Sequence, residues 1–194
     1  MHRGDIASFT LFFGLQAGIN YTVITWLPTL CADAGLHDRY GGLLVAVFVL
    51  IQAVVSLFYY NIERGLRLSR PASGILFSIF SLSGCISLLF LSEAPWVAPI
   101  TLGIATGALF PLALIFPLDF SSSPQAATRF SGMVQSGGYL LGGILPWAAG
   151  VATDVLGIST GISSLLTACS IVLALAAATV SSIYRRHGIR HEQS

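Results

Sequence analysis

The chain alternates long apolar stretches with short polar ones along almost its whole length. Each apolar stretch is about as long as the roughly 20 residues that an α-helix needs to cross the hydrocarbon core of a bilayer. Polar or turn-forming segments separate the stretches, so the pattern predicts six membrane-spanning helices. The predicted spans are residues 7–30, 41–62, 72–92, 96–118, 128–152 and 161–183, with 1–183 forming one transmembrane domain and 184–194 a basic tail.

Composition supports a membrane protein. Of the 194 residues, 55% are hydrophobic and 9% are charged, whereas about 25% of the residues in an ordinary soluble domain are charged. Six spans with short loops use nearly the whole chain. The sequence therefore leaves no room for a soluble catalytic domain.

The arginines indicate how the spans are oriented. All nine basic residues are arginines, and all of them lie outside the apolar stretches except Arg129, the second residue of the fifth. If the N-terminus, the second and fourth loops and the C-terminal tail share one side, only Arg39 falls on the other side. Because basic residues accumulate in cytoplasmic loops, we expect a protein of the cell (inner) membrane with both termini cytoplasmic. The arginines assigned to that side are Arg3, Arg64, Arg67, Arg70, Arg129, Arg185, Arg186 and Arg190.

A weak internal repeat relates the first three predicted spans to the last three. Two units of three helices necessarily point in opposite directions in a membrane, as in the inverted repeats of many transporters. The predicted fold class is therefore an all-α integral membrane protein with six transmembrane helices arranged as two inverted three-helix repeats. The matching residues are Gly14, Gly18 and Pro28 in the first span and Gly103, Gly107 and Pro117 in the fourth.

Histidines and carboxylates, the usual general acids and bases of enzymes, are missing from the predicted spans. All four histidines lie in the tails or in a loop, and the sequence contains no HExxH or Walker motif. Its one GxSxG match, GISTG at 157–161, has no histidine in a predicted span to serve as the base. We expect neither an enzyme nor a cofactor, metal site or nucleic-acid partner. The expected partners are the lipid bilayer and a small solute.

Uncharged polar side chains provide the candidate site. Gln16 and Asn20 share one helix face because they lie four residues apart, and so do Gln135 and Tyr139. Gln52 lies in the middle of the second span. Buried amides offer donors and acceptors without charge, which suits a cavity for a small polar or anionic solute. The alternative is that they join helices, a role worth about 1 kcal/mol each.

Small residues and prolines predict close packing and bends. Glycines spaced four apart allow two helices to approach closely, and a proline inside a helix removes a hydrogen bond and kinks it. Pro111 and Pro146 are therefore the candidate kinks or gates. The predicted packing glycines are Gly14, Gly18, Gly103, Gly107, Gly138 and Gly142.

Three stretches resemble cyanate-permease-like transporters of the major facilitator superfamily. They are FFGLQAGINYTVITWLP (12–28), GALFPLALI (107–115) and SGMVQSGGYLLGGILP (131–146), followed by Gly150 and Asp154. Their order and spacing resemble helices seven to twelve of that family, although the loop at 61–67 (NIERGLR) departs from the family's acidic-basic pattern. The family motifs would map onto Gln16, Tyr21, Trp26, Pro28, Pro111, Gln135, Gly138 and Tyr139.

The resemblance implies the C-terminal six-helix half of a secondary transporter. Such a protein moves a small, anionic solute, such as cyanate or a related compound, by alternating access between two halves. The partner would be a missing N-terminal half or a second copy of this chain. The alternatives are a non-functional fragment of a split or mis-started gene, and a non-transport membrane scaffold or interaction protein. The residues expected to face the pathway are Gln16, Asn20, Tyr21, Gln135 and Tyr139.

Overall fold

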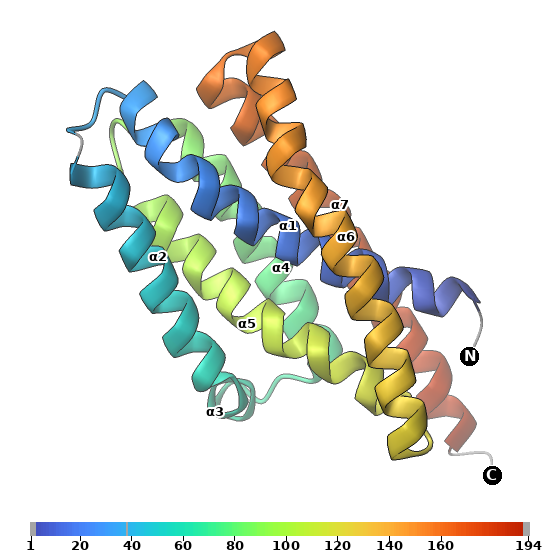
Figure 1. Ribbon diagram of the computed structural model, residues 1–194. Coiled ribbons are helices and arrows are strands. Elements are labelled where there is room, and N and C mark those ends of the chain that lie inside the picture. Colours follow the sequence, from blue (N-terminus) through green and yellow to red (C-terminus); the bar gives the residue numbers. More distant parts are fainter. Residues whose placement is uncertain (1–2, 38, 192–194) are drawn as a thin grey trace.

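The computed structural model describes residues 3–37 and 39–191, and every regular element within those ranges is a helix. Long helices run along a bundle, with the short α3 at one end (Figure 1). The all-α part of the predicted fold class is thus confirmed. The elements are α1 (Arg3–Asp33), α2 (Arg39–Leu57), α3 (Tyr59–Gly65), α4 (Arg70–Ser87), the 3₁₀ turn η1 (Leu88–Phe90), α5 (Val97–Asp119), α6 (Pro124–Leu156) and α7 (Ile158–His191).

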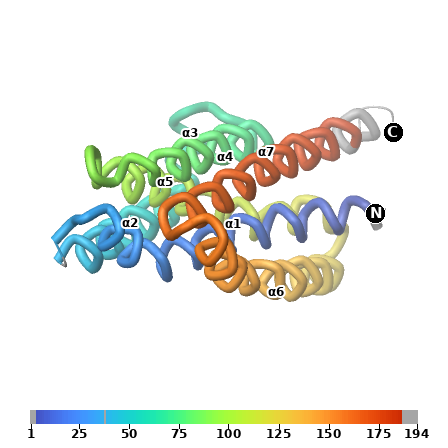
Figure 2. The backbone as a smooth tube through the Cα atoms, turned by 90° about the horizontal axis from the view of Figure 1, so that it is seen from above, coloured from blue at the N-terminus to red at the C-terminus, as the bar shows by residue number. Residues whose placement is uncertain are grey.

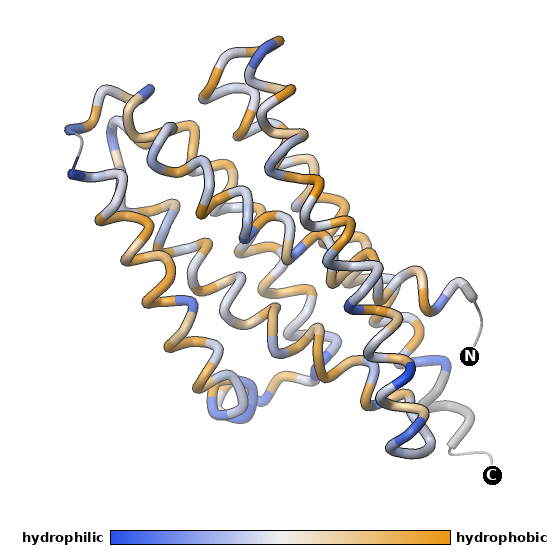
Figure 3. Tube along the Cα trace, viewed as in Figure 1, coloured by the Kyte–Doolittle hydropathy of each residue, from blue (hydrophilic) through white to orange (hydrophobic). Residues whose placement is uncertain are grey.

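Among the described residues, five helices are long and apolar enough to cross a membrane: α2, α4 with η1, α5, α6 and α7. Figure 3 shows apolar residues along these helices and polar residues gathered at α3 and the ends. Helix α1 has 31 residues but is less apolar, since Gln16, Asn20 and several glycines and threonines interrupt it. The structure thus supports five of the six predicted spans by composition.

The second predicted span, 41–62, is wrong at its C-terminal end. Helix α2 stops at Leu57, and Phe58 leaves the helical conformation with φ −99° and ψ 11° before α3 begins. Tyr59 is buried, with 2% of its surface exposed, while the neighbouring Leu57 and Phe58 are exposed. The bend therefore places Tyr59 in the core, a tertiary preference that hydrophobic periodicity does not reveal.

The connection expected between the predicted spans 96–118 and 128–152 is helical from Pro124 onward. The Ser123 side chain accepts a hydrogen bond from the backbone N–H of Ala126 (3.2 Å), and Pro124 is the first residue of α6. Serine at the N-cap followed by proline is a favourable helix start. The fifth membrane helix therefore begins earlier than hydropathy predicts.

The last two helices are almost continuous. Only Gly157 separates α6 from α7, with φ +82°, a left-handed conformation that glycine adopts without steric cost. The connection expected between the predicted spans 128–152 and 161–183 is thus a single-residue turn at Gly157. Helix α7 continues to His191, so most of the predicted tail at 184–194 extends the last helix, while residues 192–194 lie outside the described ranges.

The packing order places α1, α5 and α7 at the centre of the bundle. Helix α1 packs along α6 and α7, α5 packs along α2 and α4, and α4 packs along α7. Figure 2 shows α6 at the periphery, beside α1. The two helices with the smallest buried share are α2 and α6. These two expose most of their apolar surface.

An aromatic cluster joins α1, α5, α6 and α7 near the end of the bundle where both chain termini lie (Figure 1). The Phe9 ring centroid lies 5.2 Å from that of Phe120 and 5.5 Å from that of Phe130. Tyr184 packs edge-on against Phe120 at 4.6 Å. Tilted and edge-to-face pairs at these separations are favourable, so the cluster fastens the four helices at this end.

Candidate functional site

Two amide side chains of α1 lie inside the bundle. Gln16 is 1% exposed, and its Nε2 atom has no hydrogen-bond partner among the described residues. One turn further along, the buried Oδ1 atom of Asn20 also has none there. A desolvated amide atom without a partner costs about 1–3 kcal/mol. These two predicted residues thus carry unused hydrogen-bonding capacity within one helical turn.

Helix α6 brings aromatic side chains next to α1. Tyr139 is 42% exposed, and its ring packs edge-on against Phe13 with centroids 4.9 Å apart. The phenol of Tyr21, which is half-buried, lies close enough to that of Tyr139 for electrostatic interaction. Gln135 is half-buried one turn before Tyr139. The structure therefore places Tyr139 against α1 through Phe13, with Gln135 on the same helix as Tyr139 and Tyr21 on α1.

Glycines let α1 and α6 approach closely along the seam between them. A Cβ atom on Gly142 would lie 3.0 Å from the backbone N of Gly18 and 3.1 Å from the carbonyl oxygen of Gly14. A Cβ atom on Gly138 would lie 3.2 Å from the Gly14 nitrogen. Backbone meets backbone here, so a side chain at these positions would force the helices apart.

The glycines of the fourth predicted span lie against α2 in a similar way. A Cβ on Gly103 would lie 2.9 Å from the Phe48 carbonyl oxygen, and one on Gly107 would lie 2.7 Å from the Gln52 carbonyl oxygen. Gln52 itself is half-buried on α2. It therefore belongs to the α2–α5 seam, apart from the residues that line α1 and α6.

Pro146 takes part in a contact between helices. The indole Nε1–H of Trp26 on α1 donates a 2.9 Å hydrogen bond to the Pro146 carbonyl oxygen on α6. The Trp26 ring also lies against Gly150, where an added Cβ would be 3.4 Å away. Pro111 is half-buried inside α5. Trp26 therefore bonds α1 to the proline-containing turn of α6.

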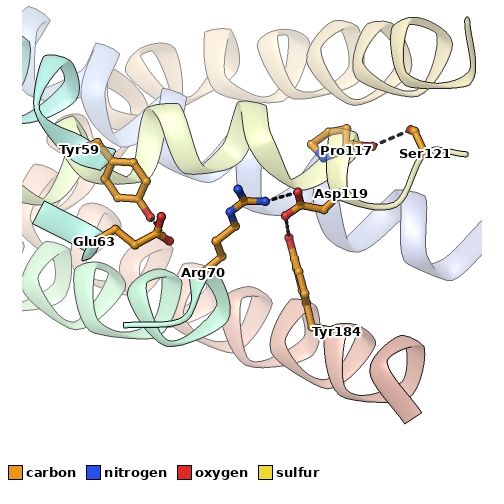
Figure 4. A network of polar contacts seen from close by, with 7 residues as sticks. All are labelled: Tyr59, Glu63, Arg70, Pro117, Asp119, Ser121 and Tyr184. Atoms are coloured by element: carbon orange, nitrogen blue, oxygen red, sulfur yellow. Dashed lines mark hydrogen bonds and ion pairs between the residues drawn. The ribbon is translucent and has the colours of Figure 1, made fainter. Parts of the chain in front are cut away.

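A polar network that sequence reasoning missed joins three helices at the α3 end. Figure 4 shows Arg70 of α4 and Tyr184 of α7 converging on Asp119 at the end of α5. Arg70 forms an ion pair with Asp119, and the Tyr184 hydroxyl donates to the other carboxylate oxygen at 2.5 Å. The only signal in the sequence was the position of Asp119 at the end of an apolar stretch, which does not identify its partners.

Beside this network, α3 contributes a second polar pair. The Tyr59 hydroxyl donates to Glu63 at 3.2 Å, as Figure 4 shows. Burial raises the pKa of the Tyr59 phenol above its ordinary value, so Tyr59 stays neutral and acts as a donor. The α3 end of the bundle therefore has an ordered, charged surface.

A smaller clamp lies at the opposite end of the bundle. The Asp33 carboxylate, at the end of α1, accepts hydrogen bonds from the Ser159 hydroxyl (2.5 Å) and backbone N–H (3.2 Å) at the start of α7. A carboxylate at a helix N-terminus is favourable because free N–H groups and the helix dipole point toward it. The clamp fixes the end of α1 against the α6–α7 turn.

These features define an integral membrane protein of helical type: its spans carry uncharged amides and phenols, and its ion pair lies at one end of the bundle. No family model matches the chain. It is 29% identical to the cyanate transport protein CynX of Escherichia coli (strain K12) over 148 residues, which is 76% of this chain and 38% of that protein.

Two further relatives are also transporters. The chain is 28% identical over 154 residues to the 2-nitroimidazole transporter of Escherichia coli (strain K12), covering 76% of this chain and 37% of the relative. It is 29% identical to the uncharacterized transporter YycB of Bacillus subtilis (strain 168), covering 75% and 36%. All three homologues are transporters of the major facilitator type, which confirms the predicted resemblance. The matched segment spans well under half of each relative.

Proposed function

We propose that the chain is one six-helix half of a secondary transporter, and that the complete transporter moves a small polar solute by alternating access. The observation that carries the proposal is the similarity of three quarters of the chain to three transporters. Two of them are named for the transport of cyanate and of 2-nitroimidazole, which favours a small solute, with an anion such as cyanate as the first candidate. Substrate would lie near the membrane midplane, between this unit and a second one.

The proposal takes α1 as the sixth span. Its 31 residues exceed the length needed to cross a bilayer, and it packs along α6 and α7. A less apolar helix is tolerated when it lies inside the bundle or lines a cavity. Both termini, α3 and the α5–α6 connection lie at one end of the six-helix bundle (Figure 1). We assign this arginine-rich end to the cytoplasmic side of the inner membrane.

The packing of the glycines supports two inverted repeats. Gly14 of α1 lies against Leu141 of α6, where an added Cβ would be 2.7 Å from the leucine side chain. Its repeat equivalent in α5, Gly103, lies against Ile51 of α2 at 3.1 Å. The repeat pairs α1 with α5 and α2 with α6. It therefore carries the α1–α6 seam onto the α2–α5 seam, as a twofold axis in the membrane plane would require.

A contact between equivalent positions agrees with such an axis. The hydroxyls of Ser81 on α4 and Ser170 on α7 lie 3.2 Å apart, and the repeat that carries Gly14 onto Gly103 also carries Ser81 onto Ser170. Residues on a twofold axis meet their own equivalents. The proposed axis would therefore pass between α4 and α7.

The partner in this proposal is a second six-helix unit, either an N-terminal half or another copy of the chain. The exposed faces of α2 and α6 carry large apolar side chains, among them Leu50 (64% exposed) and Trp147 (71% exposed). Lipid or a second unit would cover these faces. A non-functional fragment and a non-transport scaffold are the alternatives.

Transport assays test the proposal in two arms. In the first arm, the purified chain is reconstituted in liposomes and uptake of labelled cyanate is compared with empty liposomes; we expect no uptake by the chain alone. Uptake would show that copies of the chain work together, which would identify a second copy as the partner and overturn the interpretation as a non-functional fragment. In the second arm, two variants of intact CynX are made: leucine replaces the residue that aligns with Gln16, and phenylalanine replaces the residue that aligns with Tyr139. Unchanged uptake by both variants would refute the assigned pathway.

A further inference from the structure

The unpartnered amides of α1 differ from the other buried polar residues of the bundle. Thr22 and Thr106 each donate to the carbonyl four residues earlier, at 2.8 Å. Serine hydroxyls such as Ser131 and Ser163, which also have no partner among the described residues, can rotate toward carbonyls of their own helix. The longer amide of Gln16 makes no such bond, because its Nε2 atom has no acceptor within reach among the described residues.

The two unpartnered atoms are complementary. Nε2 of Gln16 is a donor and Oδ1 of Asn20 is an acceptor, and positions four apart on a helix are neighbours on the same face. They do not bond to each other in the structure. A single group that carries an acceptor beside a donor could satisfy both, as the two edges of a carboxamide or urea do.

Charge complements this chemistry. The described arginines lie within two turns of a helix end or between helices, and Arg70, which forms an ion pair with Asp119, is the first residue of α4. Nothing cationic therefore accompanies Gln16 and Asn20 in the middle of α1. A linear anion with acceptors only would satisfy the Gln16 donor and place negative charge against the Asn20 oxygen.

We propose that Gln16 and Asn20 bind a solute group that presents a hydrogen-bond donor next to an acceptor, of the carboxamide or urea type. The inference rests on the proposed transport function, and it concerns the part of the solute that contacts α1. A negative charge elsewhere on the solute is compatible with it. A bare cyanate ion would pair at this wall with the Gln16 donor alone, so it would take its other hydrogen bonds from the second unit.

Thermal unfolding of the full chain in nanodiscs tests the proposal with three probes. Acetamide has both donor and acceptor, N,N-dimethylacetamide has only the acceptor, and sodium cyanate, matched with sodium chloride, supplies the anion. A saturating ligand that binds only the folded state raises the unfolding midpoint. We expect acetamide to raise it by roughly 2 °C or more and the other two probes to leave it unchanged.

Variants assign the effect to the pair. Gln16→Met and Asn20→Leu should each abolish the acetamide shift, while Thr22→Val, on the same helix, should keep it. If one variant does not fold, the other suffices. A shift with cyanate, no shift with acetamide, or an acetamide shift that survives both variants would overturn the assignment. Because unfolding reports binding alone, these outcomes are independent of the uptake that tests the proposed function.

Discussion

Replacing Gln16 by methionine separates the two roles open to a buried amide in a membrane helix. If the amide binds a solute, it is unpaired when the solute is absent and lowers the stability of the unliganded protein. If it joins helices, it contributes stability. Methionine has a similar length and shape and a flexible, apolar end, so Gln16→Met removes the amide with little change in packing.

The expected change in the free energy of unfolding follows from the unpartnered Nε2 atom of Gln16. An unsatisfied buried donor costs about 1–3 kcal/mol, and volume-conserving core substitutions cost less than about 1.5 kcal/mol. We therefore expect a net gain of about 1 kcal/mol in the free energy of unfolding. For a chain of this size that corresponds to an increase of roughly 2–4 °C in the unfolding midpoint.

The assay is thermal unfolding of the purified chain in nanodiscs without solute. Thr22→Val is the matched control, since its hydroxyl donates to the Gly18 carbonyl at 2.8 Å within the same helix, and we expect almost no change. A lower midpoint for Gln16→Met would refute the reasoning. It would mean that the amide bonds a neighbouring helix, a contact worth about 1 kcal/mol.

Three further predictions concern packing and polar contacts. Gly142→Ala should destabilise the chain by about 1–3 kcal/mol, because its Cβ would lie 3.0 Å from backbone of α1, whereas the neighbouring Gly143→Ala meets nothing within 4 Å and should be neutral or stabilising. Trp26→Phe should cost about 1 kcal/mol through the lost hydrogen bond to α6; Trp147→Phe, on an exposed face, should cost little. Asp119→Asn should lower the free energy of unfolding by about 1 kcal/mol. The loss is small because solvent screens the ion pair at the exposed Arg70 side chain.

Thermal unfolding measures all three, and each has its own contrary result. Equal effects of the two glycine variants would mean that the α1–α6 seam is loose. For Trp26→Phe, backbone hydrogen exchange should rise in residues 147–156 of α6, and unchanged exchange would remove the role of the indole bond. The loss in Asp119→Asn should shrink at high salt, because screening weakens ion pairs; a loss that does not depend on salt would assign the effect to the hydrogen bond from Tyr184.

The candidate site was predictable in part. The four-residue spacing placed Gln16 and Asn20 on one face, and their unused amide atoms lie within one turn of α1. Spacing did not show that Gln16 is almost fully buried while Tyr139 is 42% exposed. Nor did it relate Trp26 to Pro146, because a contact between residues 120 positions apart depends on how two helices rotate and cross.

The sequence by itself determined that the chain is a series of membrane helices, and nearly where each lies. In hydrocarbon, backbone groups must be bonded within the segment, so an apolar stretch of sufficient length has one structural solution. Local averages of hydropathy therefore carry the prediction. They failed where a cap or a turn is decided by single residues, at Ser123 and at Gly157.

Only the tertiary structure decided which helices meet and what their polar groups do there. The glycine seam between α1 and α6, the Trp26 bond and the network of Arg70, Asp119 and Tyr184 each join residues far apart in the sequence. Close packing fixes the rotation of each helix, and this rotation determines whether a polar side chain finds a partner. The unpaired amides of α1 follow from the same packing, and they are the part of the structure that points to a solute.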